Sequence, residues 1–295
     1  MDYTKKLEEV MTNFISTVAI NLPQDVLSCL EDMKQNETNV RANKLYDCMF
    51  DNIDKASISK RPLCQDTGIL QFFIKVGTHN KYIDILENTI KNSVVAATKA
   101  TPLRPNAIEF FEDKNTGNNC GSNTPLIEYE LVPNSDILEI QLYLAGGGCS
   151  LPGRAKVLYP LEGYKGIVDY VMDTVIDLGV NACPPLIVGV GLSCCAPTAG
   201  MLSKKALLRN VGIRNENKKA ALLETQLING LNEVGIGPMG LMGDKSVLDV
   251  HIEYATHHPA TLAVGVSVGC WATRRGKIII NNDLSYNIVS HREVK

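Results

Sequence analysis

Arg61–Val76 reads RPLCQDTGILQFFIKV and combines the start of a strand with an unusual density of reactive side chains. Its second half, Ile69–Val76, is rich in β-branched and aromatic residues, which is typical of a strand. The first half lies between a proline and a glycine, and this predicts a shaped loop that leads into the strand. The loop carries a thiol, an amide and a carboxyl at Cys64, Gln65 and Asp66. A thiolate can bind a metal and a carboxyl can transfer a proton, so the loop is a candidate functional site.

The sequence before this strand is helical, and the sequence after it mixes helices with strands. Apolar residues recur three and four positions apart from Leu7 to Ile15, and residues 21–25 open a second helix that extends through Met33. A third helix is expected over Asn39–Asp51. Later segments are predicted as strands at Asp136–Leu144, Leu186–Val190 and Leu262–Val268, and as helices at Gly163–Leu178 and Met201–Leu208. This mixture predicts an α/β or α+β fold with a helical N-terminal cap over about residues 1–56.

Length, composition and charge limit the classes of function. The chain has 295 residues, of which 45% are hydrophobic and 21% charged, and this is enough for a substantial core. A formal net charge of −3 offers no basic field for nucleic acid. The charged N-terminus does not resemble a signal peptide, and no long apolar run predicts a membrane span, so a cytoplasmic protein is expected. Nine cysteines, an odd number, argue against a disulfide framework and for reduced thiols.

Glycine is concentrated at residues 146–148, 189–191 and 235–240. Such stretches predict loops in which the backbone approaches something closely, and they are candidates for anion cradles. None of them has the Gly-x-Gly-x-x-Gly or P-loop pattern in its required context. Nucleotide binding is therefore not the leading hypothesis.

Two further cysteines share the setting of Cys64. Cys183 precedes the apolar segment Leu186–Val190 and Cys270 follows Leu262–Val268, and each lies beside a proline or glycine at the end of a predicted strand. The three thiols are candidates for one cluster. Spacing alone favours the other interpretation, because an isolated cysteine is usually a small core hydrophobe. The chain has no Cys-x-x-Cys pair, the pattern that makes a zinc or ferredoxin site recognisable.

Seven motifs, taken in order, resemble the class I, iron–sulfur-dependent fumarase and tartrate dehydratase family. They are RPLCQDTG at 61–68, LRPNA at 103–107, AGGGC at 145–149, NACPPLIVGVG at 181–191, KKALLR at 204–209, GIGP at 235–238 and GCWATRRG at 269–276. The resemblance runs from about Leu7 to about His291 and looks closest to the α subunits of the tartrate-type members. It implies a single cluster-binding catalytic domain over residues 1–295, built from mixed β-sheets flanked by helices.

The resemblance also implies a metal centre. Members of the family hold a 4Fe-4S cluster with three cysteines and leave one iron without a protein ligand, and the matching positions are Cys64, Cys183 and Cys270. An iron with an open coordination position is a Lewis acid for a hydroxyl group. The cluster implied here is a dehydration catalyst rather than an electron carrier.

The same match assigns roles to six other residues. The implied catalytic residues are Asp66 and His258, and the implied substrate-binding residues are Gln65, Arg104, Gly147 and Gly148. An acid such as Asp66 makes chemical sense beside a leaving hydroxyl group, because hydroxide leaves poorly until it is protonated. The planar guanidinium of Arg104 suits a carboxylate. His258 directly follows His257, so a shift of one position would place the other ring in the site.

The implied activity is that of a hydro-lyase acting on a 2-hydroxy dicarboxylate. The preferred reaction converts L(+)-tartrate to oxaloacetate and water, and a two-subunit class I fumarase acting on malate and fumarate is the alternative. Single-chain relatives continue into a swivelling C-terminal domain that carries the catalytic base, whereas two-subunit relatives place it on a β subunit. We therefore expect an α subunit that is inactive alone and active in an α2β2 heterotetramer.

Two other classes of function are less favoured. A non-catalytic metal-binding subunit would have no use for Gln65, Asp66 and Arg104 beside its ligands. A thiol-redox protein would use the adjacent Cys194 and Cys195, but a disulfide between neighbours closes a strained ring, so reduced thiols are expected. For Cys149, packing or substrate contact is preferred over ligation.

Overall fold

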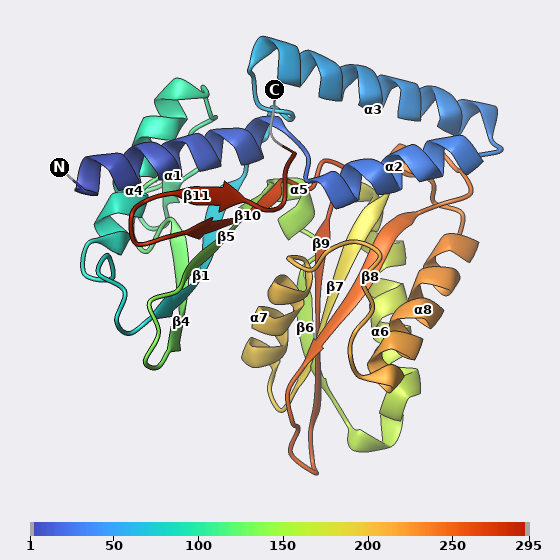
Figure 1. Cartoon of the computed structure of the whole chain (residues 1–295). Coiled ribbons are helices and arrows are strands. Elements are labelled where there is room, and N and C mark those ends of the chain that lie inside the picture. The colour runs from blue at the N-terminus through green and yellow to red at the C-terminus, as the bar shows by residue number, and fades with distance from the viewer. Residues whose placement is uncertain (1–2, 293–295) are drawn as a thin grey trace. The chain divides into compact units, whose positions relative to one another are not determined.

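The computed structural model describes residues 3–292, and Figure 1 shows their helices and strands. The predicted mixed α/β class is confirmed, because sheets of mixed strand direction alternate with helices along the described chain. The chain divides into two compact units by its contacts. Unit 1 comprises the chain up to Gln24, Asp51–Gly146 and the chain from Arg274 on, and unit 2 comprises Asp25–Phe50 and Gly147–Thr273. That the two units act as one catalytic domain stays a prediction.

The predicted N-terminal helices are present. They are α1 (Tyr3–Ile20), α2 (Gln24–Asn36) and α3 (Val40–Ser59). The third helix continues beyond the predicted end at Asp51. It ends after Ser59 because Lys60 takes a left-handed conformation, with φ of 53°, and the Arg61 N–H turns back to the Ala56 carbonyl at 3.1 Å. None of the helices in the described part of the chain is long and apolar enough to cross a membrane.

Unit 1 is built on a five-stranded sheet in the order β11-β10-β5-β1-β4. The strands are β1 (Ile69–Gly77), β4 (Leu126–Val132), β5 (Leu138–Ala145), β10 (Arg275–Ile280) and β11 (Tyr286–Ile288). Alternate residues of β1, from Leu70 to Val76, are buried in one core with α1 and α4 (Leu86–Ala100). The small strands β2 (Ile108–Glu109) and β3 (Lys114–Asn115) form a separate hairpin.

Unit 2 is built on a four-stranded sheet in the order β6-β9-β7-β8. The strands are β6 (Arg154–Leu158), β7 (Leu186–Ser193), β8 (Val247–Tyr254) and β9 (Leu262–Gly269). The helices are α5 (Gly147–Ser150), α6 (Gly163–Leu178), α7 (Ala196–Ala206) and α8 (Lys218–Glu233), with short 3-10 turns η1 (Pro160–Glu162), η2 (Gly179–Ala182) and η3 (Pro238–Gly240). Helices α6 and α8 cover one face of this sheet and α7 covers the other (Figure 1).

Two glycines of β7 bring α7 close to the sheet. A Cβ on Gly191 would lie 1.9 Å from the Ala199 carbonyl oxygen, and a Cβ on Gly189 would lie 2.1 Å from that of Ser203. Any side chain at either position would push the helix away, since heavy atoms cannot approach so closely. Residues 189–191, predicted as a loop, therefore lie inside strand β7, and their glycines allow α7 to pack closely against the sheet.

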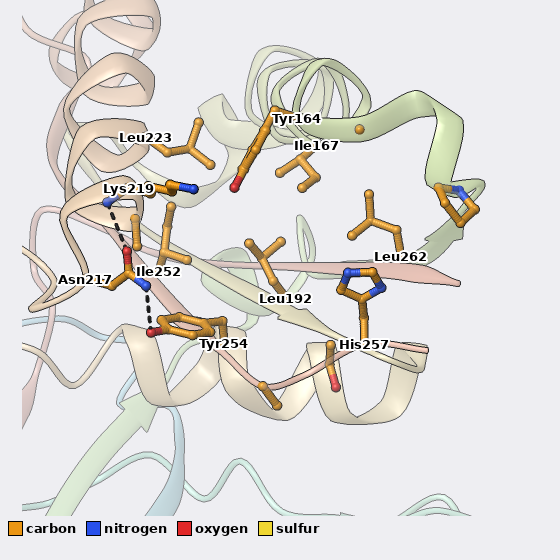
Figure 2. Close-up of a pocket in the computed structure, with 15 residues that line it drawn as sticks. Tyr164, Ile167, Leu192, Asn217, Lys219, Leu223, Ile252, Tyr254, His257 and Leu262 are labelled. Carbon is orange, nitrogen blue, oxygen red and sulfur yellow. Dashed lines mark hydrogen bonds between the residues drawn. The ribbon is translucent and has the colours of Figure 1, made fainter. Parts of the chain in front are cut away.

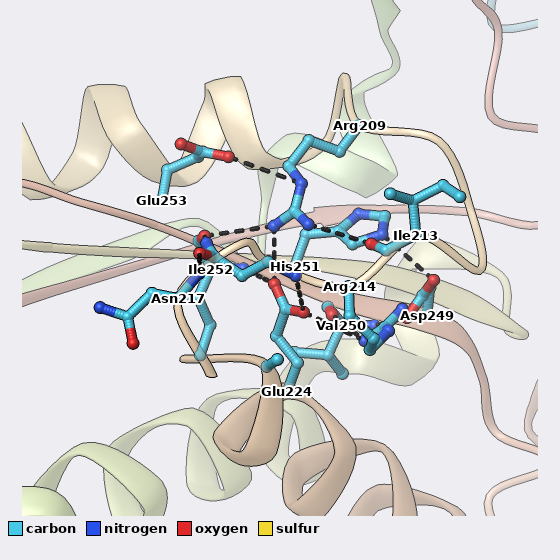
Figure 3. Close-up of polar contacts among 12 residues, drawn as sticks. Arg209, Ile213, Arg214, Asn217, Glu224, Asp249, Val250, His251, Ile252 and Glu253 are labelled. Carbon is cyan, nitrogen blue, oxygen red and sulfur yellow. Dashed lines mark hydrogen bonds and ion pairs between the residues drawn. The ribbon is translucent and has the colours of Figure 1, made fainter. Parts of the chain in front are cut away.

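The outer strand β8 is anchored by a buried ionic network, drawn in Figure 3. Glu224 on α8 has a fully buried carboxylate that contacts Arg209 at 2.6 Å and Arg214 at 3.4 Å and accepts the Ile252 N–H at 2.9 Å. Asp249 pairs with Arg214 and lies 3.1 Å from the buried ring of His251. Buried carboxylates are stable only when paired in this way. The network fixes the loop between α7 and α8 against the sheet.

Candidate active site

The loop that carries Asp66 is held against the end of β5 in unit 1. Gly68 has a φ of +79°, and a Cβ there would lie 2.8 Å from the Ala145 carbonyl carbon, so glycine is required on two counts. The Gly68 N–H donates to Asp66 Oδ1 at 3.1 Å. A Cβ on Gly146 would lie 3.0 Å from Asp66 Oδ2. The carboxyl of Asp66 therefore lies at the first glycine of the AGGGC motif.

Arg104 and Asn106 lie beside the same loop. The Thr67 hydroxyl and the Asn119 amide each donate to the Arg104 carbonyl oxygen at 3.2 Å. The Asn106 amide donates to Asp66 Oδ1 at 3.3 Å and to the Gly68 carbonyl at 3.2 Å. Arg104 itself is exposed, so solvent and ligands can reach its side chain. Unit 1 thus brings the predicted acid and the predicted carboxylate receptor into one region.

Sequence reasoning missed Asn106 as a partner of Asp66. The signal was present, because Asn106 belongs to the same LRPNA motif as Arg104. The hydrogen bonds of its side-chain amide reach Asp66, Thr67 and the loop backbone at Gly68, so Asn106 holds the carboxyl in place. An amide suits this task because it donates two hydrogen bonds without changing charge.

Cys64 and Gln65 precede Asp66 on this loop. The backbone of Leu63 is tied on both sides, since its N–H donates to Ala19 at 3.0 Å and its carbonyl accepts the Asn52 amide at 2.9 Å. Cys64 is a free, partly exposed thiol, and Gln65 is exposed. Both side chains are therefore accessible on an anchored segment.

Cys183 and Cys270 lie at the same end of the sheet in unit 2. Strands β7 and β9 are antiparallel with Ile187 opposite Gly269, so the residues before β7 and after β9 are neighbours. The Trp271 N–H donates to the Cys183 carbonyl at 3.2 Å. Neither cysteine is in a disulfide, and both are partly exposed. The structure therefore brings together two of the three predicted cluster ligands.

The backbone of Cys183 has an uncommon conformation. Its φ is 55° and its ψ is 76°, in the left-handed region that residues other than glycine seldom occupy. Such conformations persist where the surrounding structure holds them, and they concentrate at functional sites. The conformation of Cys183 agrees with a ligand role for its thiol.

The glycine turn lies next to the segment that carries Cys183. A Cβ on Gly148 would lie 2.7 Å from the Asn181 carbonyl oxygen, so α5 and η2 are in close contact. Gly147 and Gly148 are exposed, while Cys149 in the same turn is buried. The predicted substrate-binding glycines therefore share one region of unit 2 with a predicted ligand.

His258 lies at the opposite end of the same sheet. It belongs to the loop between β8 and β9, whereas Cys270 follows the far end of β9. The eight residues of β9 separate these two ends by roughly 25 Å at about 3.3 Å per residue. Within one chain, unit 2 does not bring His258 to Cys183 and Cys270.

An apolar cavity of about 350 Å³ lies at this far end of unit 2. Figure 2 shows Tyr164, Lys219 and His257 around an apolar lining. That lining comes from α6, α8 and the ends of three strands, at Ile167, Leu192, Leu223, Ile252 and Leu262. The ring Nδ1 of His257 lies 2.9 Å from the His258 carbonyl oxygen, which orients the ring. Because the cavity lies at the end of the sheet away from Cys183 and Cys270, it is not the predicted active site.

The remaining cysteines differ in their reactivity. Burial, followed by the charge of Asp249, raises the pKa of Cys29 to about 12, so this thiol stays protonated at neutral pH. Hydrogen bonding with Thr198, whose hydroxyl is 3.2 Å away, lowers the pKa of Cys195. No disulfide joins Cys194 to Cys195 in the structure, and that the pair is reduced stays a prediction.

The fit of these residues to an iron–sulfur cluster can be judged within each unit. Across residues 3–292, no three side chains of the His, Cys, Asp or Glu type gather into a metal site. Cys64 belongs to unit 1, and Cys183 and Cys270 belong to unit 2. None of the three cysteines is in a disulfide, so each can supply the thiolate that a cluster ligand requires. The thiols fit the donor set of such a cluster.

Unit 2 holds two cysteines at one end of its sheet, and unit 1 holds an acid and an arginine beside one loop. Comparison with known proteins gives the family. The family model for fumarate hydratase (Fumerase) matches residues 8–279, so the chain belongs to this family.

The chain is also similar to named subunits of tartrate dehydratases. The L(+)-tartrate dehydratase subunit alpha of Escherichia coli K12 is 48% identical over 286 residues, which cover 97% of this chain and 94% of that protein. The subunit of the same name from Escherichia coli O157:H7 has the same identity and coverage. The putative L(+)-tartrate dehydratase subunit alpha of Methanocaldococcus jannaschii is 37% identical over 273 residues, covering 92% of this chain and 96% of that protein. The family resemblance found in the sequence motifs is confirmed.

Proposed function

We propose that this chain is the α subunit of an iron–sulfur-dependent hydro-lyase that converts L(+)-tartrate to oxaloacetate and water. The observation that carries the proposal is the similarity to tartrate dehydratase α subunits, at 48% identity over 97% of the chain. The geometry supports it, because an acid and an arginine share one region of unit 1 and two thiols share one end of unit 2. The family description, fumarate hydratase, favours malate and fumarate as the second candidate substrates.

Arg104 and Asp66 have distinct tasks in this reaction. The exposed guanidinium of Arg104 binds one carboxylate of the substrate. Asp66 Oδ1 accepts hydrogen bonds from Gly68 and Asn106, which orient the carboxyl for the proton that Asp66 transfers. As the carbon–oxygen bond breaks, that proton joins the departing hydroxyl to form water. A base on a partner subunit takes the proton from the adjacent carbon, and the resulting enol becomes oxaloacetate.

Cys64, Cys183 and Cys270 are the proposed ligands of a 4Fe-4S cluster with one iron that has no cysteine ligand. When bound, such a cluster supplies a Lewis acid that makes hydroxide a better leaving group. The protein contributes the positions of the thiols. Cys183 and Cys270 are held by the Trp271 N–H, and Cys64 follows the anchored backbone of Leu63.

His258 enters this proposal through a second copy of the chain. It lies roughly 25 Å along β9 from Cys270, too far for a side chain to reach the same site. In the proposed α2β2 heterotetramer, two α subunits are related by a two-fold axis, and each contributes its His258 to the active site of the other. The name "subunit alpha" of the relatives supports a β subunit as the partner that carries the base. The proposed location is the cytoplasm, where thiols stay reduced.

Anaerobic co-expression with a tartrate dehydratase β subunit tests the function. The reconstituted complex is assayed on L-tartrate, D-tartrate, malate and fumarate, with iron and sulfide content measured on the same sample. Turnover of L-tartrate is the expected result. Failure to dehydrate any of the four compounds with a fully loaded cluster would refute the proposal.

A further inference from the structure

We propose that the apolar end of unit 2 beside His258 is the surface through which two copies of this chain pair, with Leu161 of each copy entering the cavity of the other. This inference rests on the proposed function, which assigns His258 to the active site of a second copy. It adds the contact surface that brings the two copies together. The residues that form this surface all belong to unit 2.

The position of His258 indicates what covers this end of the unit. Its proposed active-site neighbour within the chain, Cys270, lies roughly 25 Å away at the other end of β9. The Ala260 N–H donates to His258 Nδ1 at 3.1 Å, and His258 is exposed, so the ring is oriented by its own loop and remains accessible. For this ring to serve a second copy, its loop must lie against that copy. The occupant of the surface is therefore another α chain.

The apolar cavity of about 350 Å³ borders the same loop. Its lining includes residues of this loop and of the segment that starts α6, at Ala255, His257, Pro160, Gly163 and Tyr164. Figure 2 shows Tyr164 and His257 at the cavity, and because both are exposed, the cavity opens to the surface. An open cavity with a mainly apolar lining is suited to an apolar side chain from another molecule.

Leu161 is an apolar projection beside this cavity. It is fully exposed, and it lies in the 3-10 turn η1 between Pro160 and Gly163, which both line the cavity. The turn is locked, because the Tyr159 N–H donates to Glu162 Oε2 at 2.7 Å and the Glu162 N–H donates to the Tyr159 carbonyl at 3.0 Å. The leucine is therefore presented in a fixed position, which reduces the entropy lost on binding.

A projection next to a cavity is self-complementary under two-fold symmetry. In an isologous pair, the contact between Leu161 and the cavity occurs twice, once in each direction. Tyr159 and Tyr164, which lie beside Leu161 and are also exposed, enlarge the apolar surface around this contact. Aromatic residues are enriched in protein interfaces, and homodimer interfaces are more apolar than the remaining surface. The surface thus fits a second copy of this chain.

Ile58 provides a matched control. It is an exposed aliphatic residue at the end of α3, in unit 1, and does not belong to the proposed surface. Ile58→Asp therefore adds the same charge as Leu161→Asp at another exposed apolar position.

The test uses the cluster-loaded complex with its β subunit and the variants Leu161→Ala, Leu161→Asp and Ile58→Asp. Sedimentation over a dilution series gives the mass of the complex and the dissociation constant of its two αβ halves, and L-tartrate turnover is measured on the same samples. Leu161→Ala is expected to raise the dissociation constant about 100-fold, because each pair loses two buried leucine side chains. Leu161→Asp is expected to leave separate αβ halves with at least about tenfold lower turnover. Ile58→Asp should stay within about threefold of the wild type.

The outcomes separate this inference from the proposed function. If the wild type turns over L-tartrate and Leu161→Asp pairs as tightly as the wild type, the surface is refuted while the function stands. Loss of the β subunit from Leu161→Asp, with the α chains still paired, would also refute it, because the β subunit would then cover the surface. Equal weakening in Leu161→Asp and Ile58→Asp would contradict a specific contact. If Leu161→Asp does not fold or load the cluster, the dissociation constant of Leu161→Ala decides, and an unchanged value refutes the surface.

Discussion

The placement of His258 predicts that two inactive variants restore activity when they are combined. His258→Asn removes the ring from the loop between β8 and β9, and Cys270→Ser removes a proposed ligand at the other end of β9. The eight residues of β9 separate these positions by roughly 25 Å, so in the proposed assembly the two residues belong to different sites of an α2 pair. A hybrid pair that contains one copy of each variant keeps one site with both residues intact.

The expected activity follows from random assembly. If both variants are produced equally, half of the pairs are hybrids and each has one intact site of two, so the mixture should reach about a quarter of wild-type activity. Two different affinity tags allow the hybrids to be purified in tandem and assayed on L-tartrate, with iron content measured beside the rate. Each variant alone is expected to be inactive.

The control combines Cys270→Ser with Cys183→Ser. These two cysteines lie at the same end of one sheet, and the Trp271 N–H joins their segments. Hybrids of this pair have no intact site and should remain inactive. No rescue in cluster-loaded hybrids of His258→Asn and Cys270→Ser, or full activity of His258→Asn alone, would refute the assignment of His258 to a second copy.

Three other predictions test separate parts of the account. Gly148→Ala would place a Cβ 2.7 Å from the Asn181 carbonyl oxygen, so thermal unfolding should show a loss of about 1 to 3 kcal/mol in stability, and the activity should fall. Gly200→Ala is the control, because its Cβ would be 4.0 Å from the nearest atom, and it should leave stability and activity intact. Burial by itself would raise the pKa of the Asp249 carboxyl, but hydrogen bonds and nearby charge, those of His251 first, lower this pKa below 3.8. The contribution of Asp249 to stability is therefore complete above pH 3.8 and is lost as the pH falls through the lower pKa of the folded state. Urea unfolding should therefore show that Asp249→Asn costs about 3 kcal/mol at pH 7 and less near pH 3, and parallel pH profiles for the two proteins would contradict this. Iodoacetamide, followed by peptide mass analysis, should modify the exposed Cys194 and the partly exposed Cys195 long before Cys29, and Cys195→Ser should keep its dehydratase activity.

Much of the secondary structure was predictable because it depends on local periodicity. The apolar pattern at Gly163–Leu178 gives the observed bounds of α6, and the apolar run from Leu186 predicts β7. The start of α7 was misplaced at Met201, although Pro197 lies in the first turn of the helix at Ala196, where proline is favoured. The position of the proline therefore indicates the start of α7 better than the apolar pattern does.

The long-range features could not be read from local pattern. The glycines of β7 resemble a loop until the helix that covers them is known, and the neighbouring positions of Cys183 and Cys270 depend on the pairing of β7 with β9. Only the family resemblance indicated that these cysteines share a task. The separation of His258 from Cys270 was accessible in principle, because an eight-residue strand between two residues holds them apart.

The most direct test of the proposed reaction measures the formation of oxaloacetate from L-tartrate. The cluster-loaded complex of this chain with a tartrate dehydratase β subunit is compared with the same complex carrying Cys64→Ser or Asp66→Asn. The account predicts that the wild type forms oxaloacetate from L-tartrate, that Cys64→Ser fails to hold an intact cluster, and that Asp66→Asn keeps the cluster but loses at least about a hundredfold in kcat. Undiminished turnover in either variant, or no oxaloacetate from the loaded wild-type complex, would contradict it.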